Sequence, residues 1–425
     1  MNSIPFSHTS FPNLILRIHD TLRRAGYESY VVGGAVRNML LNKAILDWDM
    51  CTNAPPNRLM DIFPYAIPTG IKHGTITICR FEQKCELTSF RIDGKYTDGR
   101  HPNEVQFDAT LHEDLSRRDF TMNAMAYDLQ NSCIIDPFKG IEAIKKKEIV
   151  CVGTPQKRIS EDYLRVLRAF RFSSQLSFLI EKNLLECLIN MSSHITRISK
   201  ERITTEIKKL LSTRSVEIAM PYLCSSEILE HIFHSKLFSL SKKQYHHIGN
   251  VLSKAWANNK NTALQLALLF SFVLAYNDLL SASYARKNKQ TIIDFCSSIR
   301  ISNKEHDLIS TLLFLSSYKV DETWSIYHIR YFLTHLPIEH HNVLRAMFFY
   351  TTFQQQTIPT LFLEAIQTYI PKKKLAINGH DLMSTFGLTK GKKIGLILKG
   401  LYRIVLKTPE KNERETLLSL AKSLH

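Results

Sequence analysis

The chain has no C-x-x-C pair, although it contains eight cysteines in 425 residues. The cysteines are scattered at positions 51, 79, 85, 133, 151, 187, 224 and 296. This spacing indicates neither a zinc site nor a disulfide framework, and it is typical of a reducing compartment. We therefore expect a cytoplasmic protein.

Long apolar runs are also missing. The N-terminal stretch MNSIPFSHTSFPNLILRIHD has no charged region followed by an apolar core, so no secretory signal is expected. The most apolar stretch, ALQLALLFSFVLAY at 263–276, is too short to span a bilayer and contains Gln265. It predicts a buried helix, and no membrane partner is expected.

Acidic residues are scarce relative to basic ones. The chain has 55 Lys and Arg against 39 Asp and Glu, which gives a formal net charge of +16. Such a surplus favours an anionic partner, and nucleic acid is the commonest one. A basic but inert surface is the alternative. No motif implies a protein partner, and the length exceeds what one core accommodates, so several domains are expected.

The pattern of apolar and polar residues changes near Gly140. Before it, short β-type runs alternate with Gly, Pro and Asp, as in YVV, ILDWDM, GTITICRF, KCELTSF and EVQF. After it, amphipathic helical patterns such as EDYLRVLRAFRF and KERITTEIKKLL dominate. The sequence therefore predicts a mixed α/β domain followed by a helical half, with a basic C-terminal module from Pro371.

Two carboxylates stand two residues apart in the run ILDWDM. If this run is a strand, Asp47 and Asp49 point to one face while Trp48 turns toward the core. Like charges on one face repel unless a cation lies between them, and carboxylate oxygens suit Mg²⁺. Paired Mg²⁺ ions serve in-line phosphoryl transfer. The pattern predicts a magnesium site, with a solvated acidic strand end as the alternative.

A glycine pair precedes these carboxylates. Val31-Val32 predicts a strand, Gly33-Gly34 a tight turn and residues 35–41 a helix. Backbone N–H groups at such a turn can face a phosphate because no side chain blocks the approach. Arg37 adds a guanidinium in the first helical turn. We expect a phosphate-binding turn beside the metal site.

Together these motifs carry a resemblance. The segments GGAVR, DWD, RRDFTMNAMA (117–126), DPFKG (136–140) and EDYLRVLRAFRF (161–172) resemble the class II tRNA nucleotidyltransferase/poly(A) polymerase family in order and spacing. LAINGHDLM and GKKIGLIL extend the resemblance to the tail of bacterial members.

The resemblance implies an α/β nucleotidyltransferase head, with a mixed sheet and flanking helices, followed by all-α neck, body and tail domains. On this basis we expect a catalytic head at 1–144 and a neck with the nucleotide-selecting helix at 145–210. An RNA-binding body is expected at 211–345 and a tRNA-binding tail at 346–425.

The resemblance also assigns residues one by one. Asp47 and Asp49 match the metal-binding, catalytic carboxylates. Gly34 and Arg37 match the turn that contacts the triphosphate, and Arg118 in RRDFT matches a nucleotide-contacting arginine.

Further positions follow from the same motifs. Arg168 and Arg171 are assigned to nucleotide binding. Glu86 in CELTSF is a candidate third carboxylate, with a solvent-facing strand residue as the alternative. One position departs from the family: Asn38 follows the arginine of the glycine turn, where members usually have Asp. This change keeps hydrogen bonding but removes a charge.

Base selection is expected from EDYLR. The pattern predicts a helix that begins near Ser160 as N-cap, with Asp162 and Arg165 three residues apart and able to address one ligand. A carboxylate only accepts hydrogen bonds and a guanidinium only donates them. Such a pair suits the amine donor and ring-nitrogen acceptor of C and A and rejects U and G. The resemblance assigns the same role to this pair.

Two stretches distinguish members of the family. The segment PTGIKHGTITI (68–78) resembles the CCA-adding type, because poly(A) polymerases typically have a basic, phenylalanine-containing stretch there. FRIDGKYTDGRHP (90–102) resembles the flexible loop of enzymes that add the terminal A. We also find no His-Asp phosphohydrolase pattern.

The predicted function is therefore the addition of CCA to the 3′ end of tRNA from CTP and ATP with Mg²⁺. A poly(A) polymerase and an A-adding enzyme are alternatives within the family. A non-catalytic RNA-binding protein is the alternative from another class, and it leaves the retained carboxylates and the Asp–Arg pair unexplained.

Overall fold

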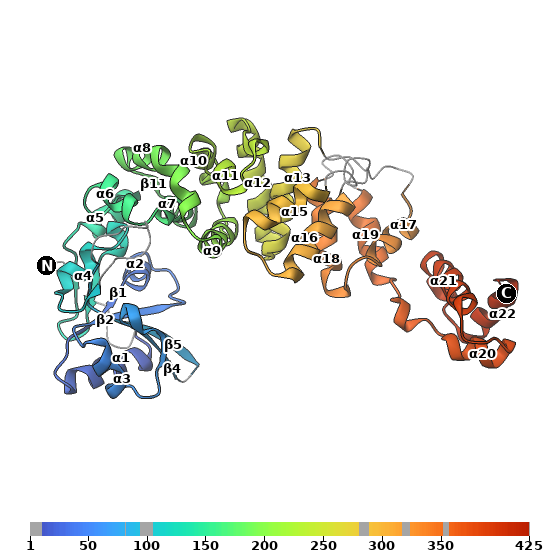
Figure 1. The fold of residues 1–425 in the computed structure, drawn as a ribbon, viewed down its shortest axis with the longest axis horizontal. Coiled ribbons are helices and arrows are strands. Elements are labelled where there is room, and N and C mark those ends of the chain that lie inside the picture. Colours follow the sequence, from blue (N-terminus) through green and yellow to red (C-terminus); the bar gives the residue numbers. More distant parts are fainter. Residues whose placement is uncertain are drawn as a thin grey trace. The chain divides into compact units, whose positions relative to one another are not determined.

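The computed structural model describes residues 11–80, 82–93, 105–279, 289–316, 324–351 and 357–424. The chain forms two compact units, residues 1–249 and 250–425 (Figure 1). The first unit holds the sheet and the second is helical, as the change of pattern predicted. Most of the loop at 90–102 lies outside the described residues, so the structure says nothing about its role.

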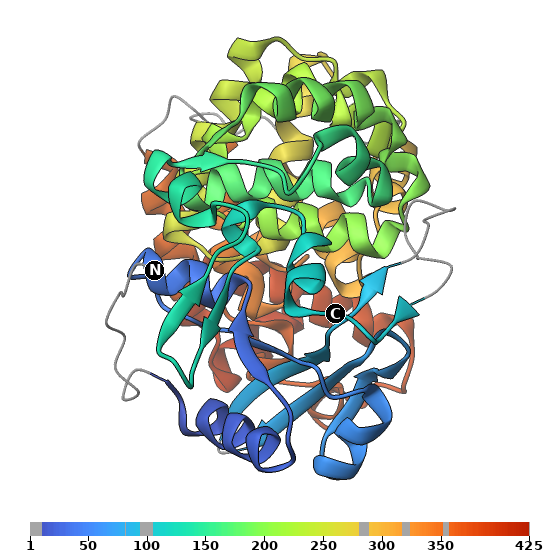
Figure 2. The same cartoon turned by 90° about the vertical axis from the view of Figure 1, so that its left-hand side faces the viewer.

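A mixed seven-stranded sheet is the frame of the first unit (Figure 2). Its spatial order is β3-β4-β5-β2-β1-β8-β9. The central strands β2 and β5 run parallel, and all remaining neighbouring pairs are antiparallel. The strands are β1 (Ser29–Val32), β2 (Trp48–Thr52), β3 (Ile67–Gly70), β4 (Thr75–Arg80), β5 (Gln83–Ser89), β8 (Ala126–Asp128) and β9 (Cys133–Ile135). Two short strands, β6 (Ile92–Asp93) and β7 (Val105–Gln106), pair with each other.

The strand register brings three functional positions together. Val32 at the end of β1 pairs with Asp49 in β2, and Asp49 pairs with Glu86 in β5. Residues in register on neighbouring strands carry their side chains on the same face. The two carboxylates are therefore neighbours, next to the residue that follows Val32, which is Gly33.

Helices flank this sheet. Apolar side chains at helical spacing are buried along α1, namely Leu14, Ile15, Ile18 and Leu22, and this helix packs against β1 and β5. The helices of this part are α1 (Asn13–Arg24), α2 (Gly34–Leu40), α3 (Pro56–Ile62), α4 (Leu111–Ser116) and α5 (Gly140–Lys146). The predicted strand, glycine turn and helix at 31–41 are confirmed: the strand begins two residues earlier than expected, at Ser29, and the helix bounds differ by one residue.

The rest of the first unit is helical apart from a two-residue strand pair, β10 (Glu148–Ile149) with β11 (Leu179–Ile180). Its helices are α6 (Pro155–Glu161), α7 (Leu164–Leu176), α8 (Lys182–Met191), α9 (Lys200–Leu211), α10 (Met220–Ser225) and α11 (Ile228–Phe233). Helix α12 (Lys242–Asn258) crosses the boundary between the units.

The prediction of a helix that begins at Ser160 is wrong. Ser160 lies inside α6, and this helix ends before Asp162, which has extended backbone angles of φ −154° and ψ 102°. The side chain of Asp162 accepts a hydrogen bond from the N–H of Leu164 at 3.1 Å. Asp162 therefore stands at the entrance of α7 rather than within a continuous helix.

The second unit consists of helices: α13 (Thr262–Tyr276), α15 (Lys289–Ser298), α16 (Asn303–Ser316), α17 (Ile326–Leu333), α18 (His341–Thr351), α19 (Thr357–Gln367), α20 (Gly379–Phe386), α21 (Lys392–Lys407) and α22 (Arg414–Leu424). The apolar run predicted as a buried helix is α13, whose residues 263–274 are all buried. Among the helices of the described ranges, none has the length and hydropathy needed to cross a membrane. The predicted fold class, an α/β head followed by helical parts, is confirmed.

The C-terminal helices α20, α21 and α22 share a small core. Its buried residues are Ile377, Leu382, Ile394, Ile397, Leu401, Val405, Leu417 and Ala421. An N-cap supports this module, because Asn378 accepts hydrogen bonds from the N–H groups of His380 and Asp381.

We expect Leu401→Ala to lower the free energy of unfolding of the C-terminal part by about 2–5 kcal/mol, because a fully buried leucine leaves a cavity when truncated. Leu401 is 0% exposed, whereas Leu396 on the same helix is 69% exposed. Leu396→Ala is therefore the matched control and should stay within about 0.5 kcal/mol. Urea unfolding followed by circular dichroism measures both, and equal losses would contradict the assigned core.

Candidate active site

The glycine turn is the centre of the candidate site. Gly33 has φ 69° and ψ −132°, a backbone conformation that residues with a side chain avoid. A Cβ atom at Gly33 would lie 3.1 Å from Nη1 of Arg118 and 3.6 Å from Oδ2 of Asp49. The turn therefore brings a predicted catalytic carboxylate and a predicted nucleotide-contacting arginine to the same point.

The three candidate carboxylates lie at one end of the central strands. Asp47 is exposed and lies just before β2, whereas Asp49 is half-buried within β2. Trp48 between them is half-buried, with its ring 5.8 Å from that of Phe11. Glu86 pairs with Asp49 in register, and its carboxylate binds Nζ of Lys84 at 2.9 Å.

This acidic group is poised for a cation. Burial raises the pKa of Asp49; Arg118 opposes that effect, while Glu86 and Asp47 add to it. A bound cation relieves such crowding of negative charge, and an all-oxygen set of ligands suits Mg²⁺. Among the described residues, no three His, Cys, Asp or Glu side chains already form a metal cluster. The fit to a divalent ion therefore rests on the chemistry of the carboxylate oxygens alone.

Arg118 stands beside these carboxylates on a fixed support. Its Nη2 donates to Oδ2 of Asp114 at 3.2 Å, and Asp114 is 0% exposed. Burial alone would raise the pKa of Asp114, but Arg118 and Arg117 hold it below its usual value. Within the described part of the chain, Nε of Arg118 is buried without a hydrogen-bond partner. A donor in this state is available to a ligand.

Arg37 occupies the other side of the turn. Its guanidinium is buried, and it donates from Nε and Nη2 to Oδ1 of Asn38 at 3.2 and 2.9 Å. Its Nη1 donates to Oδ1 of Asn123 at 2.7 Å. Nη2 also lies 3.4 Å from the position that a Cβ of Gly34 would take. Gly34 thus leaves room for this side chain.

Arg168 and Arg171 join the same group from α7. Arg168 binds Asp119 through Nε at 2.8 Å and Nη2 at 2.6 Å. Arg171 binds Glu206 of α9 at 2.6 Å, and that carboxylate is also 3.7 Å from Arg168. Burial alone would raise the pKa of Asp119, but Arg168 and Arg165 hold it well below its usual range.

One aromatic ring gathers these arginines. The guanidinium carbons of Arg37, Arg168 and Arg171 lie 5.2, 5.4 and 4.0 Å from the ring centre of Phe172. Arg171 therefore belongs to the same cationic cluster as Arg37. The cluster links the glycine turn to α7.

Asp162 and Arg165 do not pair with each other. Asp162 is held by Arg202 of α9, at 2.6 Å on Oδ2 and 3.1 Å on Oδ1. Arg165 donates to the carboxylate of Glu161 at 2.8 Å and to the backbone carbonyl groups of Arg158 and Arg117. Each side chain is thus oriented by its own partners rather than by the other.

The supporting residues were missed from the sequence. The motif RRDFTMN contains Asp119 and Asn123, and Asp114 precedes it. The segment KERITTEIKKLL, interpreted above only as an amphipathic helix, contains Arg202 and Glu206. A signal existed for Glu206: it falls on the same helical face as the buried residues 203, 207 and 210. A carboxylate on an apolar face requires a buried partner.

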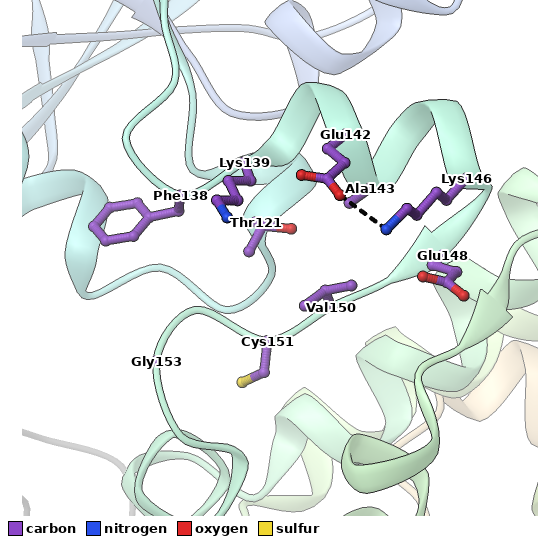
Figure 3. Close-up of a pocket in the computed structure, with 10 residues that line it drawn as sticks. All are labelled: Thr121, Phe138, Lys139, Glu142, Ala143, Lys146, Glu148, Val150, Cys151 and Gly153. Atoms are coloured by element: carbon purple, nitrogen blue, oxygen red, sulfur yellow. Dashed lines mark ion pairs between the residues drawn. The ribbon is translucent and has the colours of Figure 1, made fainter.

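A separate hollow of about 280 Å³ lies beside α5 (Figure 3). Thr121, Lys139 and Cys151 are among its lining residues, and the ion pair between Glu142 and Lys146, 2.8 Å long, lies on its wall. None of the predicted site residues lines it. The hollow is therefore not the candidate nucleotide site.

Comparison with known proteins agrees with this geometry. Residues 29–150 match the poly A polymerase head domain, residues 177–237 the probable RNA and SrmB-binding site of polymerase A, and residues 279–421 the putative domain 2 of tRNA nucleotidyltransferase. The chain is 35% identical to the CCA-adding enzyme of Oceanobacillus iheyensis, over 93% of this chain and 94% of that one. This chain belongs to the CCA-adding enzyme family. The enzyme of Anoxybacillus flavithermus is 33% identical over 95% of this chain and 94% of that protein.

A solved member of the family has the same fold. The Bacillus stearothermophilus CCA-adding enzyme in complex with CTP superimposes with a TM-score of 0.78, covers 96% of both chains and is 29% identical. The resemblance found from the motifs is thereby confirmed, and the chain is a nucleotidyltransferase.

We expect Gly33→Ala to lower nucleotide incorporation about a hundredfold, because its Cβ would displace Arg118 or Asp49 from a site that tolerates little misplacement. Gly26→Ala is the control. Gly26 also has a positive φ of 83°, but nothing lies within 4 Å of its added Cβ. Both variants should melt earlier than the parent, and only Gly33→Ala should lose single-turnover incorporation on tRNA lacking its CCA end. Similar activity in the two variants would contradict the close approach.

Proposed function

We propose that this chain adds CCA to the 3′ end of tRNA from CTP and ATP by Mg²⁺-dependent nucleotidyl transfer. The observation that carries the proposal is the meeting of the Gly33 turn, Asp49 and Arg118 at one point. Relatives matched along nearly the whole chain are CCA-adding enzymes, and a solved one is in complex with CTP. A purely RNA-binding protein would not need this combination.

Asp47 and Asp49 are the residues that would hold the metal, and Glu86 is the third candidate. A metal ion held by these carboxylates would supply charge stabilisation at the phosphoryl group that is transferred and would favour ionisation of the 3′ hydroxyl group. Support for this assignment comes from the raised pKa of Asp49 among neighbouring carboxylates. A solvated strand end would not place a half-buried carboxylate, that of Asp49, beside the half-buried Arg118.

The arginines are proposed to bind the triphosphate. Arg118 has an unpaired Nε within the described residues, and Arg37 lies on the opposite side of the glycine turn. Gly34 leaves the backbone of the turn open to a phosphate, as no side chain projects from it. Arg168 and Arg171 add positive charge from α7, although both also hold the carboxylates beneath them.

Asp162 and Arg165 are proposed to select the base. Asp162 accepts three hydrogen bonds, one from Leu164 and two from Arg202, of about four that a carboxylate accepts. Arg165 donates three hydrogen bonds from its five N–H groups. Each retains capacity for the edge of C or A without giving up its supports. Arg202 therefore orients Asp162 rather than blocking it.

The remaining assignments are also proposals. We propose the division into a head at 1–144, a neck at 145–210, a body at 211–345 and a tail at 346–425, the last two contacting tRNA. The net charge of +16 and the three exposed lysines at 372–374 support an RNA-facing surface. Eight free cysteines support a cytoplasmic location.

The proposed function is tested by supplying tRNA without its CCA end together with CTP and ATP, and sequencing the products. We expect CCA and nothing beyond it. Asp49→Ala should lose more than a hundredfold in rate, because metal stabilisation of the transition state is worth several kcal/mol. Long A tails would favour a poly(A) polymerase. Addition of A only to tRNA that already ends in CC would favour an A-adding enzyme. Binding of tRNA without incorporation would favour a non-catalytic RNA-binding protein.

Asp162→Ala should weaken base selection more than triphosphate binding. A mispaired buried polar group costs about 1–3 kcal/mol, so discrimination against UTP and GTP should fall about tenfold or more. The measurement is incorporation of each of the four nucleotides under matched conditions, with melting temperature as a check on folding. Asp61→Ala is the control, since Asp61 is a surface acid with a 63% exposed side chain. Unchanged discrimination in Asp162→Ala would reduce Asp162 to a helix-start acid.

A further inference from the structure

Arg37 is a buried cation with only neutral partners. It is 5% exposed, and its three hydrogen bonds go to the amide oxygens of Asn38 and Asn123. Among the described residues, no carboxylate forms an ion pair with it. Burial lowers the pKa of Arg37 to about 10, and the charges of Arg171 and Arg168 act in the same direction. The charge of Asp119 opposes them but is outweighed.

The charges around Phe172 do not balance. Three guanidinium groups, those of Arg37, Arg168 and Arg171, surround this ring. The two buried carboxylates nearby are already engaged, Asp119 with Arg168 and Glu206 with both arginines of α7. One positive charge is left over, and it resides on Arg37.

Asn38 decides this imbalance. The family resemblance expects Asp at this position, next to the arginine of the glycine turn. A carboxylate there would accept the same two hydrogen bonds from Arg37 and neutralise its charge. The amide accepts them without supplying a negative charge. The extra cation is therefore a consequence of one residue that departs from the family pattern.

The same side chain has a second contact that only an amide provides. Nδ2 of Asn38 donates to the backbone carbonyl of Ala44 at 3.1 Å. Beside it, the backbone carbonyl of Asn38 accepts from the N–H of Lys43 at 2.9 Å, a bond that does not depend on the side chain. These bonds hold the segment that leads to Asp47. An aspartate would set a carboxylate oxygen against the carbonyl of Ala44 with no proton between them.

We propose that Asn38 is a positioning residue that keeps Arg37 uncompensated for the triphosphate of the incoming nucleotide and tethers the segment carrying Asp47. The proposal rests on the proposed function, because it needs a nucleoside triphosphate at the glycine turn. The triphosphate is common to CTP and ATP, so Asn38 acts on both nucleotides equally. Base selection is left to Asp162 and Arg165.

Three variants separate charge from shape. Asn38→Asp adds the charge and removes the bond to Ala44, whereas Asn38→Leu removes that bond without adding a charge. Asn42→Asp adds the same charge in the same segment, at an exposed residue with φ 52°, a conformation that Asn and Asp both tolerate. For each variant, kcat and KM are measured for CTP on tRNA lacking CCA and for ATP on tRNA ending in CC. Inhibition by inorganic tripolyphosphate and the melting temperature are measured in parallel.

We expect Asn38→Asp to raise KM for CTP and for ATP by the same factor of about ten, equivalent to about 1.4 kcal/mol. The inhibition constant of tripolyphosphate should rise in parallel. Asn38→Leu should keep KM within about threefold, since Asn123 and Phe172 still hold Arg37, a change that converts to less than 1 kcal/mol. Both variants should lose kcat, because both release the segment before Asp47. Asn42→Asp should match the parent in KM and in tripolyphosphate inhibition.

The proposal fails if Asn38→Asp keeps the parent KM for both nucleotides, or if Asn42→Asp raises KM as much. It also fails if the effect falls on one nucleotide only, because a triphosphate contact cannot distinguish CTP from ATP. Failure of the proposed function looks different, since the parent protein would then not add CCA at all. A parent that adds CCA with unchanged KM in Asn38→Asp overturns only the role of Asn38.

Discussion

The structure depends on keeping several arginines charged where little water reaches them. A buried guanidinium is costly unless carboxylates compensate it, and here Asp114, Asp119 and Glu206 provide that compensation. Each of these acids is 0–7% exposed. The pairs of Asp119 with Arg168 and of Glu206 with Arg171 join the segment after α4, α7 and α9 into one support. Most of the arginines proposed to bind the nucleotide are thus held by buried carboxylates.

The acidic half of the site has a different physical origin. Strand register places Asp49 beside Glu86, and the backbone conformation of Gly33 allows Arg118 to approach. The carboxylates repel one another, and the arginine offsets only part of that repulsion. Negative charge on one side of the turn and positive charge on the other suit a metal-bound triphosphate. The carboxylates that repel one another lower the stability of the fold, and they lie at this turn.

Asn38 belongs to the same balance. An aspartate at this position would neutralise the charge of Arg37, whereas the amide accepts its hydrogen bonds and adds no negative charge. The cost is a buried cation without an ionic partner, and the stacking of Arg37 against Phe172 offsets part of it. A single neutral side chain thereby connects the triphosphate side of the site to the segment that carries Asp47.

Local patterns in the sequence were enough for the elements and for part of the site. The glycine pair, the alternation around Asp49 and the apolar run of α13 each reflect backbone or burial preferences that act within a few residues. They predicted the turn, the carboxylates and the buried helix. The strand beside Asp49 is set by long-range pairing, so the proximity of Glu86 remained an open alternative until the register was known.

Only the tertiary structure decided how the side chains proposed to contact the nucleotide are held. The stretch around Asp162 has the composition of a continuous helix, yet it breaks there. Asp162 accepts a hydrogen bond from the N–H of Leu164 at the start of α7 and binds Arg202, forty residues further along the chain. No local preference encodes such a partner, because ion pairs between distant segments form only when packing brings them together and removes water. For the same reason the partner of Arg171, Glu206 on α9, became visible only in the folded chain.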